Sequence, residues 1–367
     1  MSPDGHFCGS YRPGDVHFLL KPIGLEPILD LQEKERLIQS GQRHYSEMLS
    51  PESLPSARYL DLFRSAFAAN RQQMARDCLQ LAALIAARRS GPLTLVSLAR
   101  AGTPVGVILG HLLRGVFGRT CVHYSVSIIR DRGIDGVALR HILQQGHSPQ
   151  SLVFVDGWTG KGVISRELHH AVAAFNVRHG VQLDGGLHVL SDLAGTAACA
   201  ASCADYLIPS SILNATVSGL VSRSVLNGAI GPRDFHGCVY YAQFAGHDQS
   251  RRFADALLAD AVALAGRDGR PAPRAVDGAA AAALSGAYLA QARREYGIDD
   301  INLIKPGIGE ATRVLLRRVP ERLILRDAGA ADVAHLRLLA AEKAIPVTIQ
   351  ATLPYQAVAL IRSASDG

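Results

Sequence analysis

The segment 151–165 constrains the fold of this chain more than any other. Four apolar residues at 152–155 lead to Asp156, and a glycine-containing turn at 157–162 leads into a segment typical of a helix start. This order predicts a buried strand, a tight turn and a helix N-terminus, where backbone N–H groups point at an anion and glycine lets the backbone approach it. The turn is therefore a candidate phosphate site, and an ordinary strand-to-helix turn is the alternative.

Two common nucleotide motifs do not fit this turn. Gly162 stands where the Walker motif needs Ser or Thr, and Val155 stands where it needs its first glycine. The acid precedes the turn, whereas in the dinucleotide fingerprint it follows about 20 residues later. The segment instead resembles the diphosphate-sugar motif of the type I phosphoribosyltransferases, with Gly157 at the second acidic position of that family. The resemblance implies that Asp156 holds the ribose of phosphoribosyl pyrophosphate and that the turn binds its 5-phosphate through Gly157, Thr159, Gly160, Lys161 and Gly162.

A second strand–loop–helix pattern lies upstream, at residues 93–108. In the phosphoribosyltransferases the pyrophosphate loop sits at this place in the chain. The resemblance implies that Arg100 reaches the pyrophosphate, with Ala99, Ala101 and Gly102 keeping the backbone accessible. A plain loop with an exposed arginine is the alternative.

Between these segments, alternating apolar residues at 122–128 predict a strand, and a charged loop follows it. Family members close a flexible loop over the leaving pyrophosphate from about this place, which makes Arg130 a catalytic candidate, together with Arg132. A pair of solvated surface charges explains them equally well.

The alternation of strands and helices predicts a mostly parallel sheet with helices on both faces and ligands at the carboxyl ends of its strands. Apolar residues three and four apart predict a helix over 56–89, and further strands are expected at 186–192 and 205–209. The resemblance makes this a type I phosphoribosyltransferase-like sheet. Displacement of pyrophosphate needs cations around the diphosphate, so Mg²⁺ is the expected cofactor.

Composition agrees with a soluble enzyme. At 367 residues the chain exceeds the usual size of one core, so two domains are expected. No apolar run is long enough to span a membrane, and residues 1–6 lack a signal-peptide pattern, which predicts a cytoplasmic protein without a membrane partner. The six cysteines show no CxxC spacing and the histidines form no evident cluster, so no metal ligands are predicted. The oligomeric state stays open, with a homo-oligomer as one alternative.

The clearest boundary is rich in Pro, Gly, Ala and charge, and it predicts domains at 1–264 and 284–367 joined by a linker at 265–283. The last domain resembles the Pelota-type RNA-binding fold. By position, the residues that would face RNA are Lys305, Gly307, Gly309, Glu310, Thr312 and Arg313. A small α/β module for docking or oligomerisation is the alternative.

The two domains together resemble StiP, a bacterial stress-associated family found with tellurium-resistance functions. The resemblance predicts a phosphoribosyltransferase-like enzyme of nucleotide or nucleoside-like metabolites in a stress response. The family also carries the label cysteine protease, for which Cys238 near His236 is the closest pairing in sequence. A non-catalytic protein that binds nucleotide or RNA is the third hypothesis.

Overall fold

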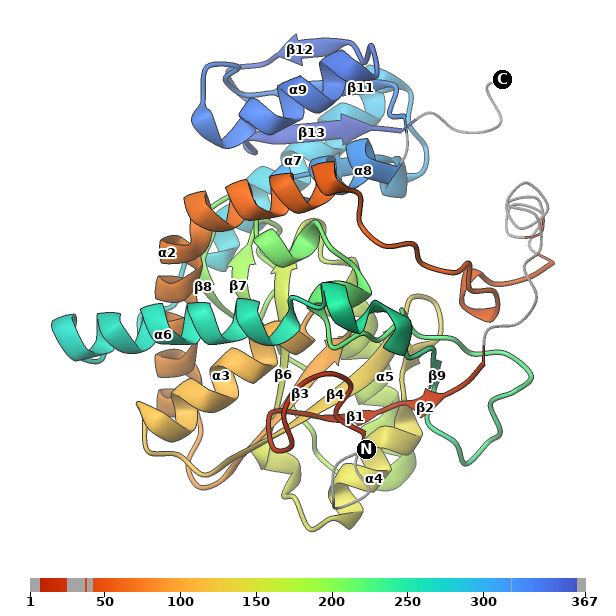
Figure 1. The fold of residues 1–367 in the computed structure, drawn as a ribbon, viewed down its shortest axis with the longest axis vertical. Helices are drawn as coiled ribbons and strands as arrows, with labels where there is room; N and C mark the ends of the chain where they lie inside the picture. Colours follow the sequence, from red (N-terminus) through yellow and green to blue (C-terminus); the bar gives the residue numbers. More distant parts are fainter. Residues whose placement is uncertain (1–6, 25–36, 38–41, 318, 362–367) are drawn as a thin grey trace.

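The computed structural model describes residues 7–24, 37, 42–317 and 319–361. They form a large α/β part and a small C-terminal α/β domain that lies above it in Figure 1. Residues 1–6, on which the targeting expectation depends, lie outside the described residues. None of the described helices is both long and apolar enough to cross a membrane.

The large part is built around one mainly parallel sheet. Its strands lie in the order β1-β4-β3-β6-β7-β8, all parallel, and a short β5 pairs antiparallel with β4. Their bounds are β1 (His17–Leu19), β3 (Leu93–Ala99), β4 (Cys121–Ile129), β5 (Gly133–Ile134), β6 (Leu152–Thr159), β7 (Leu187–Asp192) and β8 (Cys199–Ser202). A separate short pair joins β2 (Lys21–Pro22) to β9 (Gly237–Cys238).

Helices cover both faces of this sheet, as predicted. One face carries α2 (Ala57–Arg88), α3 (Thr103–Gly115) and α6 (Ser250–Asp268), which pack on one another and share one hydrophobic core. A second core lies under α4 (Gly136–Gln144) and α5 (Val163–His179). The parallel sheet with two covered faces is confirmed, whereas the finer assignment to the type I phosphoribosyltransferases is not.

Helix α2 follows directly from its sequence pattern. The Ser56 hydroxyl accepts a hydrogen bond from the Tyr59 N–H at 3.4 Å and caps the first turn. Met74, Leu81 and Ile85 are fully buried. Burying each such side chain contributes about 1.5–3 kcal/mol, which is why the apolar stripe decides the helix.

The last strand of the sheet differs from the sequence-based expectation. The apolar run 205–209 is not a strand; the strand is β8, in the small-residue run just before it. Tyr206 instead turns away to donate a hydrogen bond from its hydroxyl to Asp77 of α2 at 2.9 Å. Alanine and cysteine side chains fit between β7 and the crossing α2, so packing rather than strand propensity selects β8.

The C-terminal domain has a four-stranded sheet in the order β10-β13-β11-β12, in which only β11 and β12 are parallel neighbours. The elements are α7 (Gly278–Tyr296), β10 (Ile304–Pro306), α8 (Ile308–Arg317), β11 (Arg322–Leu325), α9 (Ala334–Glu342), β12 (Val347–Ile349) and β13 (Ala357–Leu360). Helix α7 begins inside the predicted linker, because Asp277 accepts from two backbone N–H groups of the alanine-rich run that follows it.

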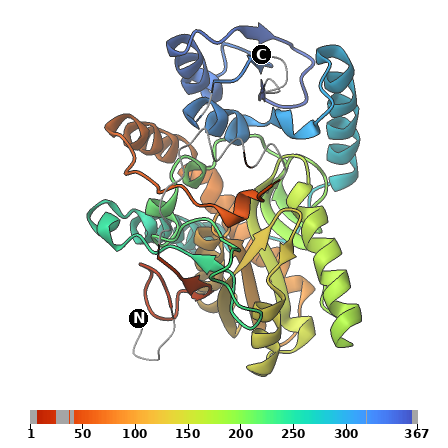
Figure 2. The ribbon, with the colours of Figure 1, turned by 90° about the vertical axis from the view of Figure 1, so that its right-hand side faces the viewer.

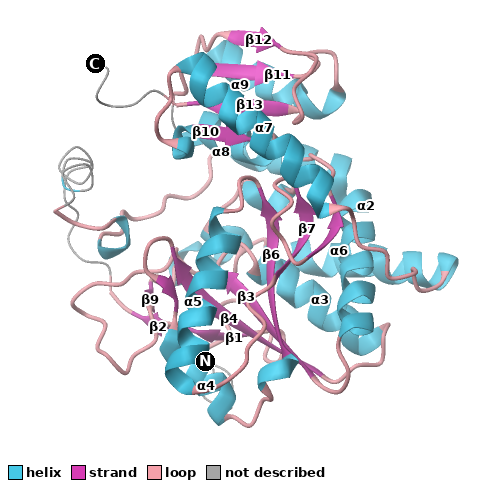
Figure 3. Ribbon diagram, turned by 180° about the vertical axis from the view of Figure 1, so that it is seen from behind, coloured by secondary structure: helices cyan, strands magenta, loops and turns pink. Residues whose placement is uncertain are grey.

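The domain sits over the carboxyl ends of the central strands. Figure 3 shows the arrowheads of β6 and β7 directed towards α8 and β10, and Figure 2 shows the same stacking from the side. The edge of the sheet at which parallel α/β folds bind ligands is therefore partly covered by the protein itself.

Gly162 gives the turn after β6 a testable constraint. Its φ is +71°, and an added Cβ would lie 2.4 Å from the Thr196 side chain. We expect Gly162→Ala to lower the free energy of unfolding by at least about 1–2 kcal/mol, measured by urea denaturation, because side chains disfavour this backbone region. Gly157→Ala is the matched control: an added Cβ there meets no atom within 4 Å. Equal stabilities of the two variants would contradict this reading of the turn.

Candidate functional site

The turn after β6 forms as predicted, but two of its polar groups are already engaged. The Asp156 carboxylate accepts a hydrogen bond from the Gly157 N–H at 2.8 Å. Thr159 is buried and its hydroxyl donates to Asp192 of the neighbouring strand. Gly162 adopts the left-handed conformation just before α5 begins at Val163. The Thr159 hydroxyl therefore serves the strand pair and does not face a cavity.

The C-terminal domain covers the outer side of this turn. The Lys161 ammonium donates to the Ile301 carbonyl at 3.1 Å and to the Ile304 carbonyl at 2.9 Å. The Arg313 guanidinium lies over the Trp158 ring, 5.9 Å from its centroid.

One glycine from each side of this domain contact lies at ordinary packing distance from the other side. An added Cβ at Gly160 would lie 3.5 Å from the Pro306 carbonyl oxygen, and one at Gly309 would lie 3.7 Å from the Trp158 ring. The predicted phosphate turn and the predicted RNA-facing residues are thus packed against each other.

Asp205, which sequence reasoning missed, anchors the same contact. Its carboxylate accepts from the Ile308 N–H at 2.8 Å and from the Gln356 N–H at 2.7 Å. Ile308 is the first residue of α8, so the carboxylate also meets the positive end of a helix. Gly307 precedes it with φ +88°. The signal in the sequence was an acid just after a strand, at the edge where ligands are expected.

Two further predicted RNA contacts differ in their surroundings. Thr312 is fully buried, and its hydroxyl bonds with the Ile308 carbonyl and the His335 imidazole inside the domain. Glu310 lies beside Gly160 and 3.6 Å from the Arg313 guanidinium. Thr312 is therefore placed as a core residue, whereas Glu310 belongs to the contact between the domains.

Burial shifts the pKa values of three side chains at this contact between the domains. It raises the pKa of Asp156 to about 7, although the Gly157 N–H and Arg313 oppose the shift. It raises the pKa of Asp205 to about 6 against the two N–H donors. Burial, helped by the charge of Lys305, lowers the pKa of Lys161 to about 8. Burial removes hydration from the charged form of each group, and the hydrogen bonds and charges around it compensate for only part of that loss.

Arg100 does not share a site with this turn. Its guanidinium forms an ion pair with Glu52, with 2.5 Å between Nη1 and Oε1, and donates to the Val221 carbonyl at 2.9 Å. The peptide bond between Ala99 and Arg100 is cis. Arg100 lines a cavity of about 480 Å³, whereas Trp158 and Gly307 line a different, much smaller one. The two predicted phosphate loops therefore face different spaces.

The positions of the residues next to Arg100 in the sequence can be described by packing and exposure. Ala99 packs against the hydrophobic core and Ala101 is exposed. At Gly102 an added Cβ would lie 2.8 Å from the Val155 carbonyl oxygen, so glycine is needed for packing between β3 and β6. These placements show why small residues follow β3 without invoking a ligand.

Arg130 and Arg132 contact the segment 44–47. The Arg130 N–H donates to the Tyr45 hydroxyl at 2.9 Å, and its guanidinium lies 5.6 Å from the centre of that ring. Arg132 forms an ion pair with Glu47 at 2.7 Å. Both arginines contact this segment, and Arg130 also lies close enough to the turn at 156–162 for its charge to help lower the pKa of Lys161.

The predicted pair of Cys238 and His236 does not form a catalytic dyad. Cys238 is fully buried in the main core, and burial raises its pKa to about 12. The His236 imidazole bonds through Nδ1 with the Ser127 hydroxyl at 2.8 Å and lines a surface cavity. Although they are two residues apart in the sequence, Cys238 lies in the core and His236 lies at a surface cavity.

Most of the other thiols also sit where a thiolate is disfavoured. Burial raises the pKa of Cys121 to about 11, and it raises the pKa values of Cys78, Cys199 and Cys203 as well. Cys203 is exposed in the loop after β8, but Asp192 and Asp277 add to the upward shift of its pKa. These four cysteines are poor candidates for a nucleophile.

Cys8 is also buried, but it lies in a turn outside the strands and helices. The Tyr11 N–H closes the turn on the Cys8 carbonyl at 3.1 Å, and Cys8 Sγ contacts the Tyr11 carbonyl oxygen at 3.4 Å. The Arg251 guanidinium donates to the same oxygen at 3.2 Å. A positive charge therefore stands close to this thiol.

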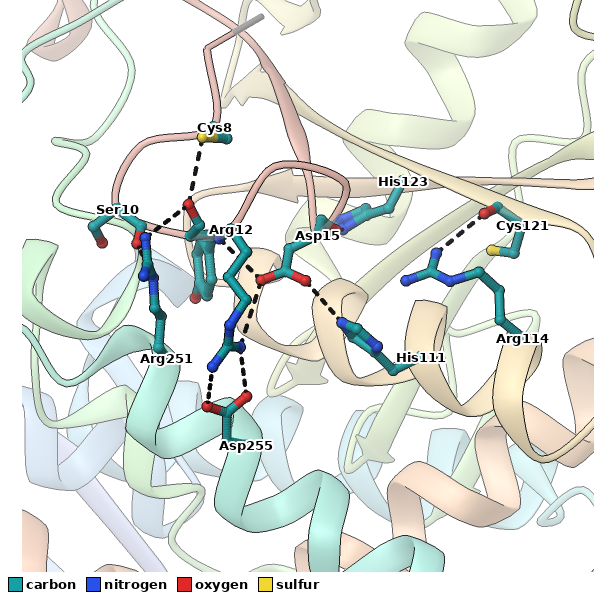
Figure 4. Close-up of polar contacts among 11 residues, drawn as sticks. Cys8, Ser10, Arg12, Asp15, His111, Arg114, Cys121, His123, Arg251 and Asp255 are labelled. Carbon is teal, nitrogen blue, oxygen red and sulfur yellow. Dashed lines mark hydrogen bonds and ion pairs between the residues drawn. The ribbon is translucent and has the colours of Figure 1, made fainter. Parts of the chain in front are cut away.

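The same loop holds an oriented imidazole. His111 Nε2 lies 2.8 Å from Asp15 Oδ1, and the Arg12 N–H donates to Asp15 Oδ2 at 3.0 Å. Burial acts to raise the pKa of Asp15, but these two hydrogen bonds outweigh it and hold the pKa below its usual value. Figure 4 shows Cys8 and His111 on different sides of Asp15, so thiol and imidazole are not in contact.

Among the described residues, no group of three or more His, Cys, Asp or Glu side chains is arranged to hold a metal ion. The expected Mg²⁺ thus stays a prediction from the sequence resemblance.

Comparison with known proteins decides the family. The sequence model of the family described as "Tellurite-like stress resistance cysteine protease StiP" matches residues 9–258, and that of the "PELOTA RNA binding domain" matches residues 283–363. The chain is 42% identical over 376 residues to "Cysteine protease StiP" of Acinetobacter baylyi, covering 98% of this chain and 96% of that protein. This chain belongs to the StiP family.

The StiP relationship corrects the predicted activity. The interpretation as a phosphoribosyltransferase was wrong, because the family and the full-length relative are both described as a cysteine protease. Phosphoribosyl pyrophosphate and magnesium lose their support with it. The alternative of a cysteine protease fits better, and the roles proposed for single residues of the two loops stay predictions from sequence.

The buried acids of the domain contact predict a pH dependence. Because the pKa values of Asp205 and Asp156 are raised above the ordinary 3.8, their contribution to stability is present below about pH 4 and is lost as the pH rises through about 6 and 7. We expect the thermal midpoint of the wild type to fall relative to that of Asp156→Asn between about pH 4.5 and 7.5; the histidines whose pKa values burial lowers act in the opposite direction, but equally in both proteins. Lys161 acts in the opposite direction only nearer pH 8.

Asp61→Asn is the control for this measurement, because Asp61 is 70% exposed. An unchanged pH profile in Asp156→Asn would contradict the assigned burial of this carboxyl.

Proposed function

We propose that this chain is a cysteine peptidase of a stress response and that Cys8 is its nucleophile. The observation that carries the activity is the near full-length relationship to a protein named as a cysteine protease. The geometry supports the choice of thiol: burial raises the pKa values of the other five, whereas Cys8 lies in a turn with a guanidinium close to it.

The chemistry needs a base beside the thiol. His111 of α3, oriented by Asp15 of the loop that carries Cys8, is the candidate imidazole. In peptide cleavage the thiolate attacks the carbonyl carbon, an S–C bond forms, the C–N bond breaks, and the imidazolium gives its proton to the leaving amine; water then hydrolyses the thioester. The loop 8–15 must shift to bring Cys8 to His111, and Gly9 and Gly14, both with positive φ, are its most adaptable residues.

Cleavage of unfolded casein tests this function. We expect Cys8→Ala to lower the rate by about 10³-fold or more, since the covalent step is lost. Cys203→Ala, which removes an exposed thiol, should retain the activity. Cleavage that survives in Cys8→Ala and disappears in Cys203→Ala would sink the assignment.

A second function is supported by the match of residues 283–363 to an RNA-binding domain. We propose that the C-terminal domain binds single-stranded RNA through Lys305 and Arg313. Arg313 already lies over an aromatic ring, Trp158, and guanidinium groups stack on bases in the same manner. Because this face packs on the turn after β6, RNA would have to replace that contact.

Fluorescence anisotropy with a labelled RNA oligonucleotide tests this binding over a range of salt concentrations. Arg313→Ala should weaken binding and reduce the slope of log affinity against log salt by about 1 if Arg313 contacts a phosphate. Arg337→Ala, on α9, is the matched control, because its guanidinium donates to the Ala328 carbonyl within the domain. Equal losses in the two variants would point to a non-specific charge effect and contradict the assigned face.

A further inference from the structure

The cavity beside Arg100 has the composition of an anion site. It measures about 480 Å³ and lies between the loop 49–56 and the short 3₁₀ segment η4 (Ala215–Val217), next to the carboxyl end of β3. Arg100 and Arg223 both line it, and Glu52 is the acid among its lining residues. Two guanidinium groups thus face one carboxylate.

Both carboxylate oxygens of Glu52 accept hydrogen bonds from donors of the kind that bind carboxylate ligands in proteins. Oε1 accepts from the Arg100 guanidinium at 2.5 Å, and Oε2 accepts from the Ala215 N–H at 3.0 Å. The side chains of Glu52 and Arg100 are only 13% and 15% exposed. A charge-assisted bond from arginine combined with a backbone N–H is a strong and directional arrangement for one carboxylate.

Two buried polar atoms lie behind the walls of the cavity. Arg223 donates through Nη2 to the Tyr45 and Met48 carbonyls, but its buried Nη1 has no partner among the described residues. The hydroxyl of Thr216, a residue 3% exposed, likewise has none in the described part of the chain.

We infer that this cavity binds a ligand bearing a carboxylate and that Glu52 occupies the place of that carboxylate in the free protein. Displacing Glu52 leaves its two donors, Arg100 and the Ala215 N–H, for the incoming group. The source of the carboxylate is a small dicarboxylic acid or the C-terminus of a peptide.

Competition with Glu52 determines how tightly such a ligand binds. A tethered group acts at an effective concentration of about millimolar or higher, so an external carboxylate binds weakly while Glu52 is in place. Removing the charge of Glu52 with little change of shape removes the competitor. The inference does not rest on peptidase activity, because binding alone is measured.

Calorimetry with succinate and with trialanine tests the site. We expect Glu52→Gln to bind one of these probes at least about tenfold more tightly than the wild type does. Trialanine with an amidated C-terminus should lose that binding if a peptide C-terminus is recognised, whereas tighter binding of succinate identifies the dicarboxylic acid. The double variant Glu52→Gln, Arg100→Gln should bind neither. Glu321→Gln, at an exposed acid, is the control for the change of charge.

Folding of the variant is checked at the same time. Arg100 loses its counter-ion in Glu52→Gln, so a lowered thermal midpoint is expected, and the carboxylate probe should restore part of it. If that variant does not fold, the wild type titrated at high probe concentration gives the answer: binding should be present and should be lost in Arg223→Gln. Unchanged affinity in Glu52→Gln, or tighter binding of inorganic pyrophosphate than of either carboxylate, would overturn the inference.

Discussion

The bond between the Asp205 carboxylate and the N-terminus of α8 is the contact on which the arrangement of this protein depends. One side chain, at the carboxyl edge of the parallel sheet, accepts from the backbone of two separate segments of the C-terminal domain, at Ile308 and Gln356. Lys161, in the turn after β6, donates hydrogen bonds to two backbone carbonyls of the same domain. The edge at which a parallel α/β fold ordinarily takes up a ligand is thereby occupied by a neighbouring domain.

This arrangement separates two loops that look alike in sequence. The turn after β6 faces the C-terminal domain, whereas the loop after β3 places Arg100 in the lining of a cavity, paired with Glu52. A strand, a short loop and a helix are dictated locally by apolar runs and glycine, so both loops could be predicted. The residues that each loop contacts come from segments far away in the chain. The local pattern therefore could not show whether the two loops share a ligand.

The same distinction explains which parts of the fold the sequence could predict. Helix α2 and strand β7 were predicted with nearly their observed bounds, because long apolar periodicity or a compact apolar run leaves few alternatives. Strand β8 was missed, since its alanine and cysteine residues are chosen by the space under α2. Asp205 and Glu52 were missed as well, because a carboxylate's partner is set by tertiary structure.

The proposed catalysis depends on Cys8, which no motif spacing in the sequence marks. Its turn, the guanidinium of Arg251 and the pair of His111 with Asp15 come together only through packing of the first loop on α3 and α6 (Figure 4). The most direct measurement is mass-spectrometric mapping of the adduct formed by a peptidyl chloromethyl ketone, with and without excess casein. The account predicts an adduct on Cys8 that casein suppresses. A protein that cleaves casein while its adduct forms elsewhere and Cys8 stays unmodified would contradict it.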